Sequence, residues 1–280
     1  MKNKMSYGDD YKSLPLTTIG NGVTIQVCED VYQYTNQFVN IIFVGHPNTA
    51  DYVVIDAGVP GGANEIISAA NSLYGSKKPK AILLTHGHFD HVGSIIELID
   101  HWKVDVYAHP LELPYLTGEE RYPEPDPSVE GGLLAKISAL FPNDPIQINE
   151  HVFPLPENGD VPFLKSFQWI HTPGHTPGHV SFFRHDDGCL VVGDAFTTVR
   201  QDQLYETIVQ KQEVNGPPRY FTTDWNEAEQ SIISLQKLEP LVVVTGHGVP
   251  VSGEELTSGL TALRANFNEV YKPDYGRYVE

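Results

Sequence analysis

Short apolar runs of strand type alternate with stretches of helical period along most of the chain. Runs with the length and β-branched content of strands cover residues 23–34, 39–46, 51–58, 81–86 and 104–109. Apolar residues three and four positions apart predict helices over residues 63–75 and 93–102, and Gly75 is a stop signal for the first of them. Strands and helices in this alternation predict an α/β fold.

The regular pattern fails between about Leu111 and Phe167, where the chain is dense in proline, glycine and acidic residues. Residues 132–141, GLLAKISALF, nevertheless keep a short helical period, so we interpret the segment as an insertion and not as a linker. Its aromatic residues can either line a substrate pocket or form a small satellite core. These aromatics are Tyr115, Tyr122, Phe141, Phe153 and Phe163.

Regular structure resumes after the insertion. Strand patterns occur in residues 166–175, 179–196 and 240–248, and helical periods in residues 226–238 and 253–267. Two halves of strands followed by helices, separated by an irregular insertion, predict a layered α/β sandwich. A length of 280 residues and a hydrophobic content of 40% favour one domain over residues 1–280. We expect the insertion at about 111–167 to shape the substrate pocket.

Histidine and aspartate crowd into the loop between the strand pattern at residues 81–84 and the helix that follows. The stretch THGHFDH lies at the edge where α/β sheets gather ligands. Side chains alternate along extended backbone, which directs His86 and His88 to the same side, where they can share one metal. Asp90 and His91 arrive as the backbone turns into the helix, and they can hold a second metal.

Three further donors follow later strand patterns. They are His175 in TPGHTPGH, Asp194 in VVGDAF and His247 in TGHG. Imidazole and carboxylate are the donors that zinc and its neighbours prefer, so the recurrence of a donor after a strand favours a shared metal site. A helix N-cap remains an alternative for Asp194, because this residue leaves a strand.

Composition narrows the choice of partners. The 36 acidic residues outnumber the 18 basic ones, and the formal charge of −18 disfavours nucleic acid and anionic membrane surfaces as partners. Cys28 and Cys189 lie far apart in apolar stretches, and we interpret them as buried free thiols. The chain shows neither an apolar signal segment nor a run of eighteen apolar residues, so we expect a cytoplasmic protein.

The donor motifs, in this order, resemble those of the metallo-β-lactamase superfamily. HGHFDH matches the H-x-H-x-D-H fingerprint, the three later segments match in order, and VVIDAG with Asp56 matches an earlier segment, so the likeness runs roughly from Val23 to Val251. The resemblance implies a four-layer αββα sandwich with a two-metal site. In that site His86, His88 and His175 would bind the first metal, Asp90, His91 and His247 would bind the second, and Asp194 would bridge them.

The resemblance also restricts the reaction. No ligand position holds cysteine, and an aspartate stands at the bridging position, which makes antibiotic hydrolysis less favoured than the chemistry of glyoxalase II or of acyl-homoserine-lactone lactonases. The tyrosine of those lactonases is replaced by Thr197, and a basic glutathione-binding set near the carboxyl end is missing. We predict a hydrolase with two zinc ions per chain, or iron or manganese, that cleaves a small-molecule ester, lactone or thioester by a metal-bound hydroxide. Asp90 would orient the hydroxide and carry its proton.

Several alternatives stay open at this point. The same fold also serves iron-dependent thiol or persulfide dioxygenases and β-lactamases, while an intact donor set argues against a non-catalytic scaffold. Asp56 either accepts a hydrogen bond from a ligand imidazole or the backbone, or is an ordinary turn residue. His179 is either a structural histidine or a neighbour of the site. The tyrosine-rich tail from Asn268 packs either on its own domain or on a second subunit, as in a homodimer.

Overall fold

Two units make up the chain in the computed structural model, which describes residues 4–47, 49 and 51–279. Unit 1 comprises Met1–Tyr122 and Pro142–Lys165, and unit 2 comprises Pro123–Phe141 and Ser166–Glu280. The predicted insertion is therefore divided, because its middle part belongs to unit 2 and its flanks belong mainly to unit 1. Each unit contains one sheet with its own helices.

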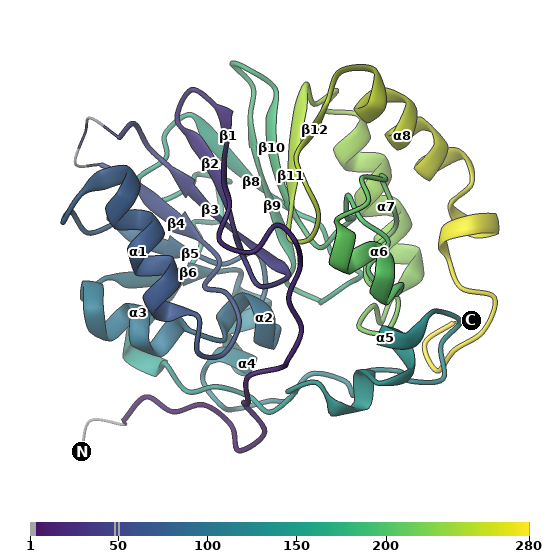
Figure 1. Cartoon of the computed structure of the whole chain (residues 1–280), viewed down its shortest axis with the longest axis horizontal. Coiled ribbons are helices and arrows are strands. Elements are labelled where there is room, and N and C mark those ends of the chain that lie inside the picture. Colours follow the sequence, from purple (N-terminus) through teal and green to yellow (C-terminus); the bar gives the residue numbers. More distant parts are fainter. Residues whose placement is uncertain (1–3, 48, 50, 280) are drawn as a thin grey trace. The chain divides into compact units, whose positions relative to one another are not determined.

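A seven-stranded sheet forms unit 1, with the strands in chain order from β1 to β7. The first four strands pair antiparallel and the last four parallel. Helices α1 (Ala63–Tyr74) and α3 (Ile95–Trp102) contact each other beside this sheet (Figure 1). The strands are β1 (Thr24–Cys28), β2 (Val31–Asn36), β3 (Val39–Val44), β4 (Val53–Ile55), β5 (Ala81–Leu83), β6 (Asp105–Ala108) and β7 (Val152–Pro154), and the short helices are α2 (Phe89–Val92), η1 (Pro110–Glu112), α4 (Leu113–Leu116) and η3 (Asn149–His151).

The structure corrects two details of the sequence interpretation in unit 1. Residues 23–34 form two strands, not one, because the polar pair Glu29 and Asp30 makes a turn between β1 and β2. Cys28 is only half-buried, since β1 is the edge strand of the sheet, whereas Cys189 in unit 2 is buried as predicted; both are free thiols. Strand β7, within the insertion, was not predicted from its proline-rich sequence.

A five-stranded sheet in the order β12-β11-β10-β9-β8 forms unit 2. Its core includes Leu190 and Val243 from the strands, Trp225 and Ile232 from α7, and Leu260 from α8. The helical periods of α7 and α8 thus bury their apolar faces as predicted. The elements are α5 (Leu133–Lys136), η2 (Ser138–Leu140), β8 (Phe167–His171), β9 (Val180–Arg184), β10 (Cys189–Gly193), α6 (Leu204–Val209), α7 (Trp225–Gln236), β11 (Val242–Thr245), β12 (Val251–Ser252), α8 (Gly253–Ala265) and the π-helix η4 (Phe267–Tyr271).

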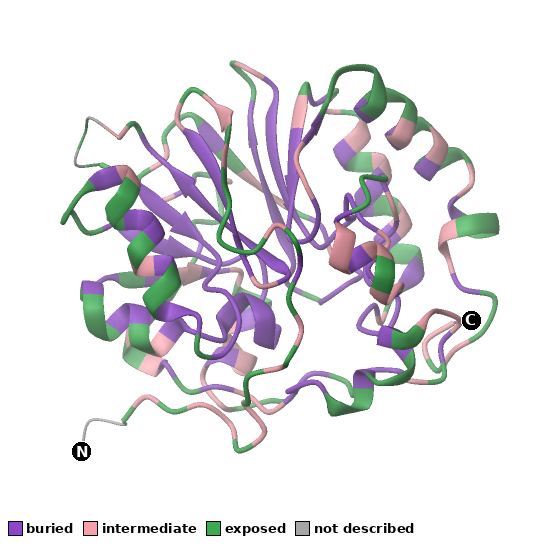
Figure 2. Ribbon diagram, viewed as in Figure 1, coloured by how far each residue is buried: buried purple, intermediate pink, exposed green. Residues whose placement is uncertain are grey.

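Burial follows this division into sheets and covering helices. The strands from β2 to β5 and β9 and β10 are buried throughout, while the longer helices α1, α3, α7 and α8 keep one exposed face (Figure 2). Among the described residues, no helix combines the length and the apolar character that crossing a membrane requires.

The carboxyl-terminal tail packs on its own chain, within unit 2. The backbone N–H of Arg277 donates to the buried carboxylate of Asp126, and the N–H of Asp274 donates to Glu130 at 2.9 Å. The backbone N–H of Glu130 in turn donates to the carbonyl of Tyr275 at 3.0 Å. Arg219, 7% exposed, forms an ion pair with Glu130 at 3.1 Å. Of the two placements left open by the sequence, the structure shows the intrachain one.

Replacement of Asp126 by asparagine is expected to weaken this attachment. Burial raises the pKa of Asp126, but hydrogen bonds from Ser128 and from the N–H of Arg277 outweigh it and hold the pKa below its usual value. Hydrogen bonds to a charged group are worth about 1.5–3 kcal/mol, so the thermal midpoint at pH 7 should fall by about 3–6 °C. Because the pKa is lowered on folding, this stability exists above the unfolded pKa of about 3.9 and is lost as the pH falls through the folded value.

Thermal unfolding of the native chain and the variant between pH 3 and pH 7 checks this expectation, and the two midpoints should converge below about pH 4. Asp274→Asn is the matched control, because it removes the same charge from an exposed side chain of the same tail. An equal loss of stability in the control would contradict the role of Asp126.

Candidate metal centre

Four of the predicted donors come together in unit 1, between β5 and the start of α3. His86, His88, Asp90 and His91 are all buried, with exposed fractions of 0%, 4%, 6% and 0%. The ring of His86 lies 4.8 Å from that of His88 and 4.1 Å from that of His91, measured between centroids. Donor atoms of His86 and His88, and likewise of Asp90 and His91, lie within 4.8 Å of each other. The motif therefore brings the four side chains of these two predicted pairs close together within unit 1.

Two glycines allow the chain to follow this tight path. A Cβ atom on Gly93 would lie 2.3 Å from the backbone nitrogen of Pro60, and one on Gly87 would lie 2.7 Å from the hydroxyl of Tyr122. The segment after β4 packs directly against this motif, because the N–H of Ala57 donates to the carbonyl of His91 at 2.7 Å. Close approach of neighbouring groups, and not a left-handed backbone, requires glycine at both positions.

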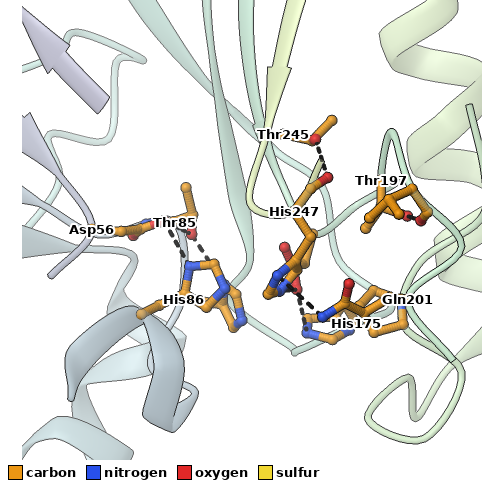
Figure 3. Close-up of polar contacts among 12 residues, drawn as sticks. Asp56, Thr85, His86, His175, Thr197, Gln201, Thr245 and His247 are labelled. Carbon is orange, nitrogen blue, oxygen red and sulfur yellow. Dashed lines mark hydrogen bonds and ion pairs between the residues drawn. The ribbon is translucent and has the colours of Figure 1, made fainter. Parts of the chain in front are cut away.

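Asp56 accepts hydrogen bonds from His91, one of the unit 1 donors, and from Thr85, which precedes another. Of the two roles left open for Asp56, the structure therefore shows the acceptor of a hydrogen bond from a donor imidazole and from the backbone. Oδ1 of Asp56 accepts the backbone N–H of Thr85 at 2.8 Å, and its Oδ2 accepts the Thr85 hydroxyl at 2.8 Å (Figure 3). Oδ2 also accepts the Nδ1–H of His91 at 2.8 Å. The backbone of Asp56 has φ +64°, a strained conformation for a residue other than glycine. Strain of this kind persists where surrounding contacts hold it, often at a functional site.

These hydrogen bonds also determine which ring nitrogen of His86 and of His91 points away from Thr85 and Asp56. A carboxylate only accepts, so Nδ1 of His91 carries its proton toward Asp56. The Thr85 hydroxyl gives its proton to Asp56, so its oxygen accepts the Nδ1 proton of His86 across 3.0 Å. Both imidazoles then present Nε2 with a lone pair, which is the arrangement that a buried carboxylate gives to metal-binding histidines.

The other three predicted donors come together in unit 2, each in the loop after a strand. His175 follows β8, Asp194 follows β10 and His247 follows β11, and their exposed fractions are 2%, 2% and 1%. Oδ2 of Asp194 lies 3.6 Å from Nε2 of His175 and 3.2 Å from Nε2 of His247. No helix begins at Asp194, so the N-cap alternative is wrong. One carboxylate oxygen therefore faces two imidazoles.

Hydrogen bonds hold the unit 2 donors as well. Nδ1 of His175 lies 3.3 Å from the hydroxyl oxygen of Thr222, whose proton goes to the carbonyl of Pro218, so Nδ1 is the donor here too. The side-chain amide of Gln201 lies 3.2 Å from Nδ1 of His247 (Figure 3). Both contacts use Nδ1 and turn Nε2 toward Asp194.

His179 supports the donor Asp194. Its Nε2 accepts the backbone N–H of Asp194 at 2.8 Å, and its Nδ1 lies 2.9 Å from the hydroxyl of Thr172. Both ring nitrogens of His179 therefore lie within hydrogen-bonding distance of groups in unit 2, and this histidine holds the end of β10 in place.

The donor chemistry fits a divalent metal. All seven side chains are imidazoles or carboxylates, all are buried, and Nδ1 of four of the five histidines faces an oxygen or an amide group. Buried imidazoles fixed in this way, next to carboxylates, match the preferences of zinc, iron and manganese.

Sequence patterns missed several residues that hold this site. Thr85 precedes His86 directly, so the motif itself could have indicated it, but Thr222 and Gln201 lie in loops without any periodic signal. Glu112 and Tyr122 also reach the unit 1 motif, at the N–H of Gly87. Burial, and then the charge of Glu112, raise the pKa of Tyr122 well above its usual value, so its hydroxyl stays protonated.

Comparisons with known proteins agree with the donor motifs. The model of the metallo-beta-lactamase superfamily matches residues 34–247. The chain belongs to this superfamily. The probable metallo-hydrolase YflN of Bacillus subtilis is 46% identical over 92% of this chain and 98% of its own length. Hydroxyacylglutathione hydrolase GloC of Haemophilus influenzae is 31% identical over 50% of this chain and 59% of its own.

Solved structures show the same fold. The archaeal superfamily protein ST1585 from Sulfolobus tokodaii has a TM-score of 0.56 at 22% identity, covering 90% of this chain and 85% of that one. TTHA1623, solved in a di-iron-bound form, has a TM-score of 0.50 at 30% identity, covering 76% and 89%. The predicted metallo-β-lactamase fold is confirmed, and the protein is a metal-dependent hydrolase.

Proposed function

We propose that the donors of the two units form one dinuclear zinc centre that hydrolyses an ester, lactone or thioester bond of a small molecule. The first metal would be held by His86, His88 and His175, the second by Asp90, His91 and His247, and Asp194 would bridge them. The observation that carries this proposal is Oδ2 of Asp194, which faces two imidazoles at 3.2 and 3.6 Å, as a bridging carboxylate does.

Bound metals would lower the pKa of a water molecule and polarise the scissile carbonyl. The chain supplies the other parts of the reaction. Asp90, 6% exposed beside His91, is placed to take the proton of the attacking water and pass it to the leaving alkoxide or thiolate. The Thr197 hydroxyl donates to the carbonyls of Val199 and Gly216. Thr197 is therefore not expected to act in place of the lactonase tyrosine.

Thioesters are supported by the name of one relative, hydroxyacylglutathione hydrolase GloC. An iron-dependent oxidoreductase on a thiol or persulfide is the second candidate, favoured by the di-iron-bound form of TTHA1623. The substrate of either reaction would be a small molecule, and the charge of −18 supports this choice over nucleic acid.

A panel of lactones, thioesters, phosphoesters and β-lactams tests the proposed reaction on the zinc-loaded protein. Turnover of an ester, lactone or thioester well above the other classes is expected. Stoichiometric iron in the native protein, together with oxygen uptake on a thiol substrate, would instead establish the second candidate.

The proposed centre should hold about two metal ions per chain, because a lone zinc would use only about four of the seven donors. Elemental analysis after reconstitution of the metal-free protein measures this number. Saturation at one ion, with Asp90 or His247 replaceable without loss of metal, would reject the dinuclear centre.

A further inference from the structure

A buried carboxylate outside the donor motif reaches into it. Glu112, at the end of η1, has an exposed fraction of 0%, and its Oε2 accepts the backbone N–H of Gly87 at 2.9 Å. Gly87 is the residue between the donors His86 and His88. Burying a carboxylate is unfavourable unless strong hydrogen bonds offset the loss of its hydration. A role in packing alone would therefore favour an apolar side chain at this position.

Tyr122, which lies in the predicted insertion, contacts both Glu112 and Gly87. Its hydroxyl donates to Oε2 of Glu112 and lies 3.0 Å from the same N–H of Gly87. Its ring is 7% exposed, lies 4.7 Å from the ring of His88, and stacks on Tyr115 with centroids 3.8 Å apart. The phenol therefore touches the peptide between the two donors and the second donor itself.

Both side chains converge on one peptide group. The N–H of Gly87 is shared between the carboxylate and the phenol, and a Cβ atom at Gly87 would collide with the phenol oxygen at 2.7 Å. A shift of this peptide would change the separation of His86 and His88, since one residue joins them. The geometry of the pair thus depends on two side chains that no donor motif contains.

We propose that Glu112 and Tyr122 are positioning residues that clamp the peptide of Gly87 and thereby set the affinity of the site for the metal shared by His86 and His88. This inference rests on the proposed metal centre. In this role both side chains act through the peptide of Gly87 and not as metal ligands. Outer hydrogen bonds of this kind typically contribute about 10–100-fold to metal affinity.

Competition with a chelator for zinc tests the clamp, in the full chain and at a temperature well below thermal unfolding. Tyr122→Phe keeps the stacked ring and removes only the hydroxyl, and its zinc dissociation constant should rise by about 10–100-fold. Tyr115→Phe is the matched control, since it removes a hydroxyl from the stacking partner, and its zinc affinity should stay within about 2-fold of the native value.

Glu112→Gln gives an independent measurement, because it keeps an oxygen that can accept the N–H of Gly87. Its loss of zinc affinity should be smaller than that of Glu112→Ala. The thermal midpoint of each metal-free variant is measured alongside. The inference is overturned if Tyr122→Phe and Glu112→Gln lower that midpoint but bind zinc like the native chain, or if Tyr115→Phe loses as much affinity as Tyr122→Phe. Failure of the native chain to bind zinc would instead reject the proposed centre.

Discussion

Replacement of His88 by alanine is expected to remove metal binding and turnover together. The change deletes an imidazole that is 4% exposed and lies next to His86, so one of the proposed ligands of the first metal is lost. Loss of a supporting residue already costs about 10–100-fold in metal affinity, and loss of a direct ligand should exceed this. Zinc affinity by chelator competition, and turnover on the substrate that the panel identifies, are the two measurements.

His101→Ala is the control for this variant. His101 is an exposed histidine of α3 in the same unit, so its replacement removes an imidazole without touching the donors. Native affinity and turnover are expected for it. Equal activity in the two variants would mean that the metal binds elsewhere.

The locations of the candidate donors could be predicted, because each of these residues follows a strand or belongs to one short motif. THGHFDH directs four donors to one place by local geometry alone, and the three strand ends supply the rest. The residues that hold the donors were not predictable in the same way. Gln201 and Thr222 lie in irregular loops whose positions depend on contacts distant in sequence, such as the one from Thr222 to His175, 47 positions away.

In the fold, too, elements set by the local sequence could be predicted, whereas elements set by contacts distant in sequence could not. The amphipathic period of α1, α7 and α8 is a local property, and these helices form where the sequence predicts them. Strands β7 and β12 have two or three residues each, and they form because a longer neighbour, β6 or β11, offers them a hydrogen-bonding edge. Pairing of this kind leaves no periodic pattern in the shorter strand.

The burial of the aromatic residues in the insertion also depends on contacts between residues distant in sequence. Tyr122 and Phe141 are buried, as a satellite core would have them, whereas Phe153 and Phe163 are exposed by 41% and 58%. Tyr122 does more than pack, because its hydroxyl reaches Gly87 in the donor motif. Aromatic content alone could not distinguish these outcomes, since the three-dimensional path of the insertion decides them.

Asp90→Asn is expected to lower turnover by about 10²–10⁴-fold even when excess zinc restores metal occupancy, the range that general acid–base assistance typically supplies. Asparagine keeps the shape and one oxygen donor of Asp90, so the variant tests the charge and the proton separately from the fold. Proton transfer belongs to the transition state, whereas substrate binding involves other contacts, so kcat should fall more than KM changes.

Asp100→Asn is the matched control for this experiment, because it removes the same charge from an exposed side chain of α3 that forms an ion pair with Lys103 at 3.3 Å. Zinc titration of both variants precedes the kinetics, and the second metal is expected to bind more weakly in Asp90→Asn alone, since a neutral amide is a poorer ligand than a carboxylate. Turnover is then measured at zinc concentrations that saturate each variant. Full recovery of the rate of Asp90→Asn by added zinc would confine Asp90 to metal ligation, whereas a persistent loss with both metals bound assigns the proton transfer to its carboxylate.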